Sequence, residues 1–556
     1  MQIPIINGAY TDMQANYRTA YPRNLVPVPK QNGIAEGYLR VFDGLTQFAA
    51  PLNITGSERG GINWNGVLYR VVGSKLVSYN ASGVPTVITD VGDDGQTVVF
   101  DYSFDYLAVA SAGKLYYYTP AGVSTAASLS IVTGGTAYQV GDTLQFVNGV
   151  WATVTAIGGG GVVTGVALFE SGISLSASLP VNPQAQLTTT GAGQNLQVTI
   201  NWVPAPDNTV QVTTSFLGTV VDFLWMAGYF VSTDGTNIIP TDLTAPTHVI
   251  FADYGSSEAD PDPITGLIKY RNELYVFNRY TCEVFYNVGG TNFPFQANEG
   301  AIVEKGSLSR RTKCKFAQQV AFVGSARNEP CSIYLLAPGF ASKIATQEVE
   351  EVLRGYTEDV LAQAVLEARE DRVHQHLFFH LPDQTLVYDY AASQVLQQPI
   401  WFVLGTDASA YGKYRARHFV YCYDKWTCGD TLDSRIGYLD RTVATAYGAL
   451  VGWQFDVQFL YNEHKGAVVQ VLELIGLTGR APAGTKPTIS MSYTRDGLTY
   501  SNQRFVNLGT LGQFQKRMQW LNALFFREVA SLRFKGTTSA LCSFTRLEAD
   551  TEPLNK

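Results

Sequence analysis

The chain has 556 residues, of which 46% are apolar, 12% aromatic and 15% charged, and its formal net charge is −8. This composition can bury large cores and excludes an intrinsically disordered chain. The N-terminal stretch MQIPIINGAY lacks the basic lead and apolar core of a signal peptide, so we expect a soluble protein without a membrane span that is made in the cytoplasm.

The acidity is confined to one region. Between Lys114 and Lys269 there are ten acidic residues and no lysine or arginine, which leaves 39 basic against 37 acidic residues elsewhere. An acidic region of this length repels nucleic acid. Six scattered cysteines without a C-x-x-C pair argue against a disulfide scaffold or a zinc site.

The first thirty residues show no strong periodicity of apolar residues. Pro22, Pro27 and Pro29 lie close together, which indicates an extended N-terminal arm over residues 1–30. We expect such an arm to pack on another surface, for example on a neighbouring subunit.

Further along, short apolar strands alternate with turns, and the units end in aromatic residues. A period of about 40–50 residues with four strands per unit is typical of propeller blades. Unrelated hairpins packed in sandwiches are the alternative. The fold class we predict is mainly β, with a propeller core over residues 31–121 and 209–450. Marker aromatics are spaced by 47, 114, 45, 59, 54 and 50 residues: Tyr69, Tyr116, Phe230, Tyr275, Tyr334, Tyr388 and Tyr438.

The outlying step of 114 residues coincides with a change in composition. Residues 122–208 are rich in Gly, Ser, Thr, Val and Ala and contain no basic residue. Alternating strands with glycine turns predict a small inserted β domain that interrupts a blade, although a flexible linker is the alternative.

One segment has helical spacing, in IATQEVEEVLRGYTEDV (344–360). Val349, Val352 and Leu353 recur on one side, with Thr346 suited to cap the start and Gly355 to end the helix. We therefore predict a short helical segment near 346–364. From residue 451 to 556 the pattern returns to strands and predicts a C-terminal β-sandwich-like region.

Catalytic motifs are missing from the sequence: it has no P-loop, G-x-S-x-G elbow or H-E-x-x-H helix. The stretch HQHLFFH puts His374, His376 and His380 on one face of a strand, where imidazoles could bind zinc or copper. A polar strand face at solvent or at an interface explains the same pattern. Because no ligand spacing elsewhere completes a site, we expect neither a metal nor a cofactor.

Two features of the sequence bear on a glycosidase function. SYTRDGLTYS (492–501) resembles a degenerate aspartate box of sialidase-type propellers, but Asp496-Gly497 is also a strong hairpin turn. A glycosidase further needs two carboxylates facing each other across a cleft. A propeller glycosidase or depolymerase acting on host surface polysaccharide is therefore the alternative function.

Basic residues form two clusters that are candidates for subunit interfaces or phosphate contacts. No recognition helix or zinc finger accompanies them, so sequence-specific DNA binding has no support. The candidates are Lys305, Arg310, Arg311, Lys313, Lys315, Lys516 and Arg517.

Several stretches resemble the packaged DNA stabilisation proteins of short-tailed bacteriophages, also called tail hub or nozzle proteins. The similarity is carried by Lys305-Gly306, by Lys343-Ile344-Ala345-Thr346 before the predicted helix, and by His380-Leu381-Pro382 followed by Leu386-Val387-Tyr388-Asp389. Further similar stretches lie at 37–48, 57–76, 262–277 and 427–430.

The resemblance implies a non-enzymatic propeller subunit of the virion tail, assembled in the host cytoplasm. It implies a ring of six copies below the portal and the head–tail adaptor, which retains packaged double-stranded DNA and conducts it during ejection. Tail fibres or tailspikes and a distal plug or needle are the other implied partners. Residues 122–208 match no better-known member and could form an elaborated nozzle tip.

In such a ring, a conduit should not adhere to phosphate. We therefore hypothesise that the cation-free region faces the lumen or the exit and that the basic clusters face subunit interfaces or the adaptor. The acids we assign to the lumen or exit are Asp142, Glu170, Asp207 and Asp222.

Overall fold

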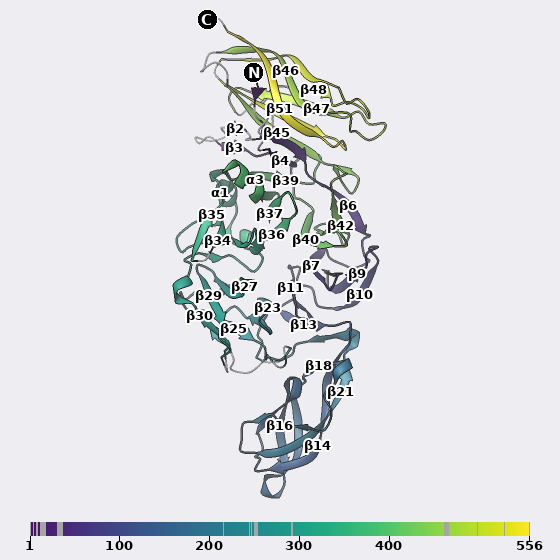
Figure 1. Ribbon diagram of the computed structural model, residues 1–556, viewed down its shortest axis with the longest axis vertical. Helices are drawn as coiled ribbons and strands as arrows, with labels where there is room; N and C mark the ends of the chain where they lie inside the picture. Colours follow the sequence, from purple (N-terminus) through teal and green to yellow (C-terminus); the bar gives the residue numbers. More distant parts are fainter. Residues whose placement is uncertain are drawn as a thin grey trace.

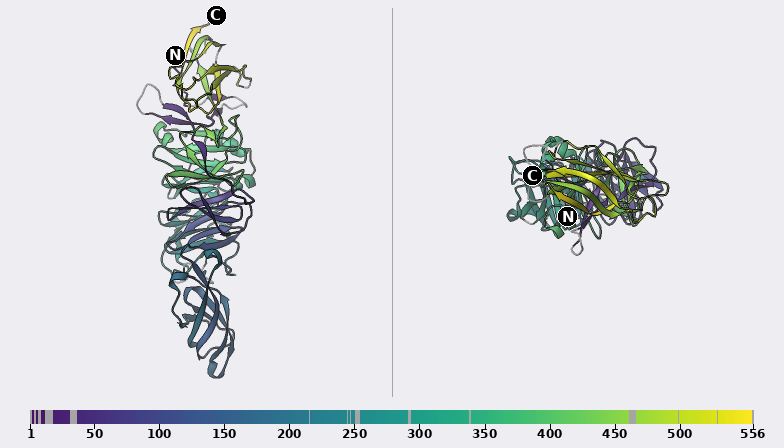
Figure 2. Two further views of the ribbon diagram at one scale, coloured as in Figure 1. Left: turned by 90° about the vertical axis from the view of Figure 1, so that its right-hand side faces the viewer. Right: turned by 90° about the horizontal axis from the view of Figure 1, so that it is seen from above.

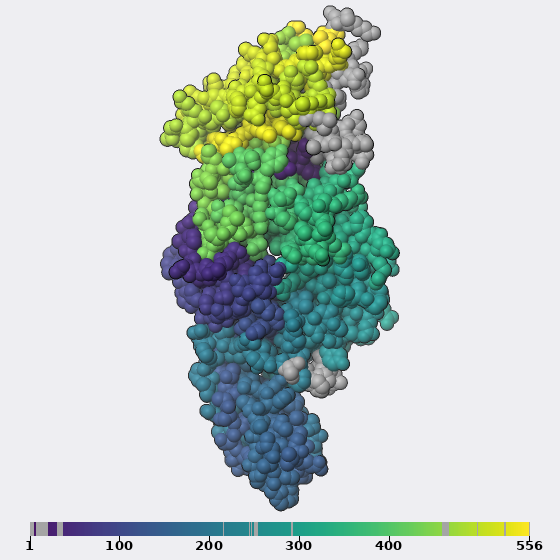
Figure 3. All heavy atoms as spheres, turned by 180° about the vertical axis from the view of Figure 1, so that it is seen from behind, coloured from purple at the N-terminus to yellow at the C-terminus, as the bar shows by residue number. Residues whose placement is uncertain are grey.

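The protein is elongated and has three parts arranged along its longest axis (Figures 1 and 2). A propeller lies in the middle, an inserted domain at one end, and a sandwich near both termini at the other end; Figure 3 shows the same order from behind. Within the described residues, no helix has the length and apolar character needed to cross a membrane. The computed structural model describes residues 2–3, 5–6, 9–11, 18–30, 37–214, 216–243, 245, 247–249, 254–290, 293–337, 339–460, 466–497, 499–527 and 529–554.

Seven sheets, antiparallel except where β43 (Thr445–Ala446) joins β6 (Gly44–Ala49), form the blades of the propeller, and each of the seven marker aromatics lies in a different sheet. The predicted propeller is therefore confirmed. Blades 1 to 4, from the innermost strand outward, are β7 (Glu58–Trp64), β8 (Val67–Val72), β9 (Lys75–Tyr79) and β10 (Pro85–Asp90); β11 (Val99–Tyr102), β12 (Leu107–Ser111), β13 (Lys114–Tyr118) and β22 (Thr209–Gln211); β23 (Asp222–Met226), β24 (Tyr229–Thr233), β25 (Asn237–Pro240) and β26 (Gly255–Ser256); and β27 (Ile264–Tyr270), β28 (Glu273–Asn278), β29 (Cys282–Asn287) and β30 (Phe295–Ala297).

The last three blades follow the same plan with additions at their edges. Blades 5 to 7 are β31 (Gly306–Ser307) and β32 (Lys313–Phe316) with β33 (Gln319–Ser325), β34 (Ser332–Ala337) and β35 (Phe340–Lys343); β36 (Val365–Glu370), β37 (Gln375–His380), β38 (Thr385–Asp389) and β39 (Trp401–Leu404); and β40 (Ala416–Cys422), β41 (Lys425–Asp430), β42 (Ile436–Asp440) and β6 (Gly44–Ala49), extended by β43 (Thr445–Ala446) and β44 (Ala449–Leu450).

Apolar side chains fill the space between each blade and the next. Separate buried clusters join blades 1 and 2, 2 and 3, 3 and 4, 4 and 5, 5 and 6, 6 and 7, and finally 7 and 1. In the last of these, Leu68 and Tyr79 of blade 1 pack with Val420 and Ile436 of blade 7. The blades are twisted sheets covered on both faces, which is why their strands are apolar along most of their length.

Blade 7 is completed by a strand from the opposite end of the chain. Strand β6 pairs antiparallel with β42, with Leu45 opposite Leu439. The closure also carries buried charge: Arg70 of blade 1 lies 2.8 Å from Glu58, and the second oxygen of Glu58 lies 2.7 Å from Nδ1 of His418 in blade 7. A Cβ at Gly429 would lie 1.9 Å from this carboxylate, so only glycine leaves room for it.

The inserted domain interrupts blade 2 between its third and fourth strands, because Tyr116 of β13 still pairs with Gln211 of β22. Its two sheets enclose an apolar core that includes Phe146, Val154 and Val198. The first sheet is β18 (Ile173–Leu175), β14 (Val123–Thr136), β21 (Gln194–Pro204) and β19 (Gln184–Ala185), and the second is β17 (Val163–Glu170), β16 (Val150–Ile157), β15 (Thr143–Phe146) and β20 (Thr188–Thr189).

The C-terminal strands form a sandwich whose core includes Trp453, Trp520 and Phe544. N-terminal strands extend one of its sheets, so residues 25–29 of the expected arm pack on their own chain. One sheet holds β4 (Leu25–Pro29), β5 (Gly37–Val41), β51 (Ser543–Pro553), β46 (Ala467–Leu477) and β49 (Met518–Phe526), with β1 (Gln2–Ile3) beside β51, and the other holds β45 (Gly452–Leu460), β50 (Val529–Thr537), β47 (Thr488–Thr494) and β48 (Arg504–Asn507); β2 (Ala9–Thr11) and β3 (Arg18–Ala20) form a hairpin.

The predicted helical segment is two helices, α1 (Gln347–Arg354) and α2 (Glu358–Gln363), between blades 5 and 6. The Thr346 hydroxyl accepts a hydrogen bond from the Val349 amide at 3.4 Å, as the capping pattern indicates. Both helices bury apolar side chains in the cluster between blades 5 and 6. A third helix, α3 (Tyr390–Leu396), was not predicted because its short sequence YAASQVL follows directly on a strand.

We predict that removing the buried charge at the closure is costly. Burial alone would raise the pKa of Glu58, but His418 and Arg70 together hold it below its usual value. Glu58→Gln leaves the Arg70 guanidinium without its counter-charge, which should lower the free energy of unfolding by about 3–5 kcal/mol. Urea denaturation of the purified protein measures this loss.

The matched control lies in the same blade, where Lys75 and Asp90 form an exposed pair. Asp90→Asn should cost about 0–1 kcal/mol, because solvent screens that pair. Equal midpoints for the two variants would contradict a stabilising role of the buried charges.

Candidate functional site: the axial channel of the propeller

The innermost strands of the blades surround a cavity of about 630 Å³, which we call the axial channel. Residues of β11, β23, β27, β32, β36 and β40 line it. Its wall contains three carboxylates and several basic side chains. The charged lining residues are Asp101, Asp222, Glu367, Lys269, Arg310, Arg311, Lys313 and Lys315.

Two channel carboxylates tie one blade to the next. Asp101 of blade 2 accepts a hydrogen bond from the Trp225 amide of blade 3 at 2.6 Å. Asp222 of blade 3 accepts one from the Leu267 amide of blade 4 at 2.8 Å. Burial raises the pKa of Asp101, and the amide hydrogen bonds to its carboxylate oppose that effect.

Glu367 links blades 6 and 7 in the same way, through hydrogen bonds from backbone amides. A bulge in β40 between Arg417 and Val420 frees two backbone amides from the ladder. Glu367 accepts both of them, from His418 at 2.9 Å and from Phe419 at 2.8 Å. The carboxylates of the channel therefore satisfy backbone donors of neighbouring inner strands.

The first basic cluster contributes three further links across the channel. Lys313 of blade 5 donates to Asp222 of blade 3 at 2.6 Å, and both side chains are almost fully buried. The Arg310 guanidinium donates to the carbonyls of Val221 at 2.7 Å and Thr97 at 2.8 Å. Arg311 donates to the side chain of Gln96, and Lys315 is exposed.

The other predicted cations lie elsewhere. Lys305 pairs with Glu329 in blade 5, and Arg517 pairs with Glu473 on the sandwich, where Lys516 is exposed. The basic candidates thus occupy three separate places, and only Arg310, Arg311, Lys313 and Lys315 come together.

The four acids assigned to the lumen or exit also separate. Asp142 accepts a hydrogen bond from the Gln139 amide at 2.9 Å, and Asp207 lies exposed in a turn of the insertion. Glu170 lies at the root of the insertion, 3.4 Å from Nε2 of His248, beside a second cavity of about 470 Å³. Asp222 alone belongs to the axial channel.

The histidine strand divides into two sites. Nε2 of His380 lies 2.6 Å from Glu367, next to the channel, and burial lowers the pKa of His380. His374 and His376 instead converge on Asp389. The Asp496-Gly497 turn is in the sandwich, and Asp496 accepts a hydrogen bond from the Thr499 amide at 2.8 Å within that turn.

Sequence reasoning missed Glu58, Asp101 and Glu367 as links between blades. The available signal was an acid that directly follows apolar residues on the first strand of a repeat unit, as in AVLE and VVFD. The sequence shows where such an acid lies. Its partner belongs to a neighbouring blade, and no pattern near the acid in the sequence indicates it.

Two family models match the chain, one for each main part of the fold. The model for the β-propeller of bacteriophage P22 Gp10 matches residues 1–163 and 170–444, and the model for the β-sandwich of the same protein matches residues 452–552. The chain belongs to the P22 Gp10 family. The resemblance to tail hub proteins of short-tailed phages is thereby confirmed. The expectation that residues 122–208 match no better-known member is wrong, because the propeller model covers most of this segment.

A curated relative supports the P22 Gp10 family assignment over nearly the whole chain. The tail hub protein gp10 of Salmonella phage P22 is 26% identical over 553 residues, which cover 97% of each chain.

Similar solved structures include the N-terminal domain of Nup159, at 11% identity and a TM-score of 0.35, with 74% of this chain and 98% of that chain covered. They also include an exo-β-1,3-galactanase from Phanerochaete chrysosporium, at 7% identity and a TM-score of 0.23, with 92% and 100% covered. Similarities this weak carry no functional argument.

We predict that the propeller loses stability as the pH falls from about 7 to about 5. Burial lowers the pKa of His380, so its imidazole binds a proton less readily in the folded protein than in the unfolded chain, where a histidine takes up a proton near pH 6.5. Preferential proton binding by the unfolded chain reduces the free energy of unfolding. At lower pH, Glu58 and Glu367 add to the loss, because their folded pKa values lie below the usual ones.

Calorimetric Tm values across this pH range test the prediction. His380→Gln should flatten the dependence between about pH 6.5 and pH 5, since glutamine does not titrate. An unchanged slope in this variant would assign the acid sensitivity to other groups.

Proposed function

We propose that this protein is a structural subunit of the tail of a short-tailed phage. It forms a ring of six copies below the portal and adaptor, retains the packaged DNA and conducts it during ejection. The observation that carries the proposal is the match of both propeller and sandwich to P22 Gp10, with a relative called a tail hub protein aligned over 97% of each chain.

The small volume of the axial channel favours a path for DNA between subunits over a path through a single propeller. The cavity of about 630 Å³ has the volume of a small-molecule pocket, which is far less than a stretch of duplex DNA occupies. Two of its cations are also engaged within the chain, since Arg310 binds carbonyls and Lys313 binds Asp222. DNA would therefore pass through a lumen enclosed by several copies.

The use of the channel carboxylates favours a structural role over the alternative glycosidase. A hydrolase needs one carboxyl group to give up a proton and another to attack or activate water. Here Asp101, Asp222 and Glu367 accept backbone hydrogen bonds from the next blade. Such carboxylates support the wall of the propeller.

Exposed apolar side chains on the sandwich support assembly with other tail proteins. Phe505 of β48 and Leu521 and Phe525 of β49 are 66%, 61% and 49% exposed, and Phe514 in the preceding connection is 67% exposed. Large apolar side chains gathered on neighbouring strands are typical of protein interfaces. We assign this end of the molecule to contacts within the ring or with the adaptor.

The insertion is our candidate for the nozzle tip. It lies at the far end from the sandwich, as Figure 1 shows, and it contains no lysine or arginine. Asp142 and Asp207 give it negative charge that would keep DNA from adhering at the exit. Tail fibres or tailspikes and a distal plug or needle are the partners we expect beside it.

Ring formation is the first test. Negative-stain images of the purified full-length chain, alone and with a portal–adaptor preparation, should show closed rings with a constant number of subunits. The same preparation should release no sugar from host surface polysaccharide. A persistent monomer that cleaves polysaccharide, and loses this activity in Asp101→Asn or Glu367→Gln, would establish the glycosidase instead.

The charge of the insertion provides a second test. Phages carrying Asp142→Lys and Asp207→Lys together should eject their genome several-fold more slowly, because each added cation can bind a passing phosphate. Ejection is followed from intact particles of equal DNA content.

The matched control is Glu552→Lys, an exposed acid on the sandwich. It should leave the ejection rate unchanged. If the insertion variant ejects DNA at the wild-type rate, the insertion does not border the path of the DNA.

A further inference from the structure

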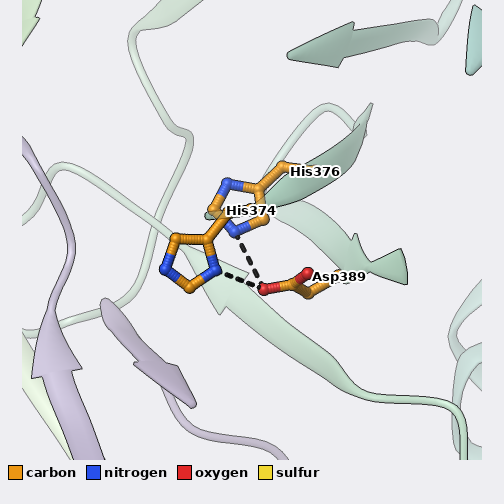
Figure 4. A group of neighbouring side chains, drawn as sticks. All are labelled: His374, His376 and Asp389. Atoms are coloured by element: carbon orange, nitrogen blue, oxygen red, sulfur yellow. Dashed lines mark hydrogen bonds and ion pairs between the residues drawn. The ribbon is translucent and has the colours of Figure 1, made fainter. Parts of the chain in front are cut away.

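Three side chains from two neighbouring strands of blade 6 converge near the start of α3 (Figure 4). His374 lies just before β37, His376 lies in β37, and Asp389 is the last residue of β38. His376 and Asp389 are direct partners across the sheet. Potential ligand atoms of all three lie within 4.8 Å of one another, and all three residues are buried.

His376 is the least satisfied member of this cluster. Only 1% of it is exposed, and neither ring nitrogen has a hydrogen-bond partner among the described residues. Its Nε2 lies 3.3 Å from Asp389 Oδ2 but is not aligned for a hydrogen bond. Apart from this contact with Asp389, the ring nitrogens of His376 are unsatisfied, and a buried imidazole in this state is costly unless a further group binds one of them.

The spacing of the three residues suits a metal ion. Bonds of about 2.0–2.1 Å in a tetrahedral zinc site place neighbouring ligand atoms about 3.3 Å apart. The distance between His376 Nε2 and Asp389 Oδ2 has this value. His374 Nδ1 lies 2.7 Å from the same oxygen and would move outward by about half an ångström on binding.

Contacts behind the cluster hold two of the ligands in place. The second oxygen of Asp389 accepts a hydrogen bond from the Ala392 amide at 3.1 Å, which fixes the carboxylate at the start of α3. Asp371 accepts the His374 amide at 2.8 Å. Arg369, the partner of His376 on the other side, forms its ion pairs with Asp43 and Asp371. Outer contacts of this kind orient metal ligands.

We propose that His374, His376 and Asp389 bind one divalent transition-metal ion, with zinc the best match to two imidazoles and a carboxylate. This departs from the expectation of no metal drawn from the sequence, because the structure removes His380 from the set and adds Asp389. Three protein ligands leave the fourth position of the ion to water or another small ligand, and the bound ion would join β37 to the β38–α3 junction. Phe42, whose ring centre lies 6.0 Å from that of His376, links the site to the segment that enters the closing strand β6.

Metal content of the full-length protein tests the site. The chain is stripped with a chelator, incubated with zinc, desalted and analysed for zinc by mass spectrometry. Wild type should retain about one zinc per chain, and His376→Gln less than about a tenth of that. Co²⁺ in place of zinc should give the visible absorption of a tetrahedral site, and zinc should raise the Tm of wild type but not that of His376→Gln.

His380→Gln is the matched control, since His380 lies on the same strand but binds Glu367. It should retain zinc like wild type. Asp389→Asn preserves a cap for α3 and should also lose zinc, which guards against misfolding of the His376 variant. Zinc retained equally by wild type and His376→Gln, or no zinc and no Co²⁺ absorption in wild type, would overturn the proposal.

Discussion

Carboxylates that reach from one inner strand to the backbone of the next hold this propeller together at its axis. An inner strand has a partner on one side only, so part of its backbone donors point toward the channel, where leaving them unpaired is costly. Asp101, Asp222 and Glu367 accept such donors from the following blade. Charged acceptors make stronger hydrogen bonds than neutral ones, but their own burial requires nearby positive charge. Lys313 supplies that charge to Asp222, which accounts for basic residues in an otherwise apolar propeller.

The closing blade links this axial arrangement to the rest of the molecule. Strands β4 and β5 belong to the sandwich, and after Phe42 and Asp43 the chain enters β6 of blade 7. Asp43 forms ion pairs with Arg40 and, in blade 6, with Arg369. The N-terminal segment therefore contributes to the sandwich, the closing blade and blade 6 within a few residues. Because closure needs this distant segment, the propeller cannot be completed until the chain ends have met, and the loop-closure entropy favours slow folding.

The features that could be predicted from the sequence are those that repeat along the chain or that depend on neighbouring residues. Marker aromatics such as Tyr275 and Tyr334 indicated one unit per blade, and Thr346 indicated the start of α1. Features built from distant segments were not predictable: Glu58 meets His418 across 360 positions, and Glu367 reaches backbone amides freed by a bulge. The cluster of His374 and His376 shows the same limit. Spacing on one strand suggested His380 as the third member, whereas strand pairing supplies Asp389.

Charged side chains of the axial channel bind groups of the same chain, and this limits where a surface for partners can lie. The three channel carboxylates, Arg310 and Lys313 are bound to groups of the same chain, which leaves few charged groups there for a substrate or for DNA. The groups still available are on the outside and at the two ends: exposed apolar side chains on the sandwich and acids on the insertion. Exposed apolar side chains favour association with other proteins, whereas acidic side chains repel phosphate. In the role proposed above, the sandwich end would serve assembly and the insertion end the passage of an anionic polymer, with the propeller between them.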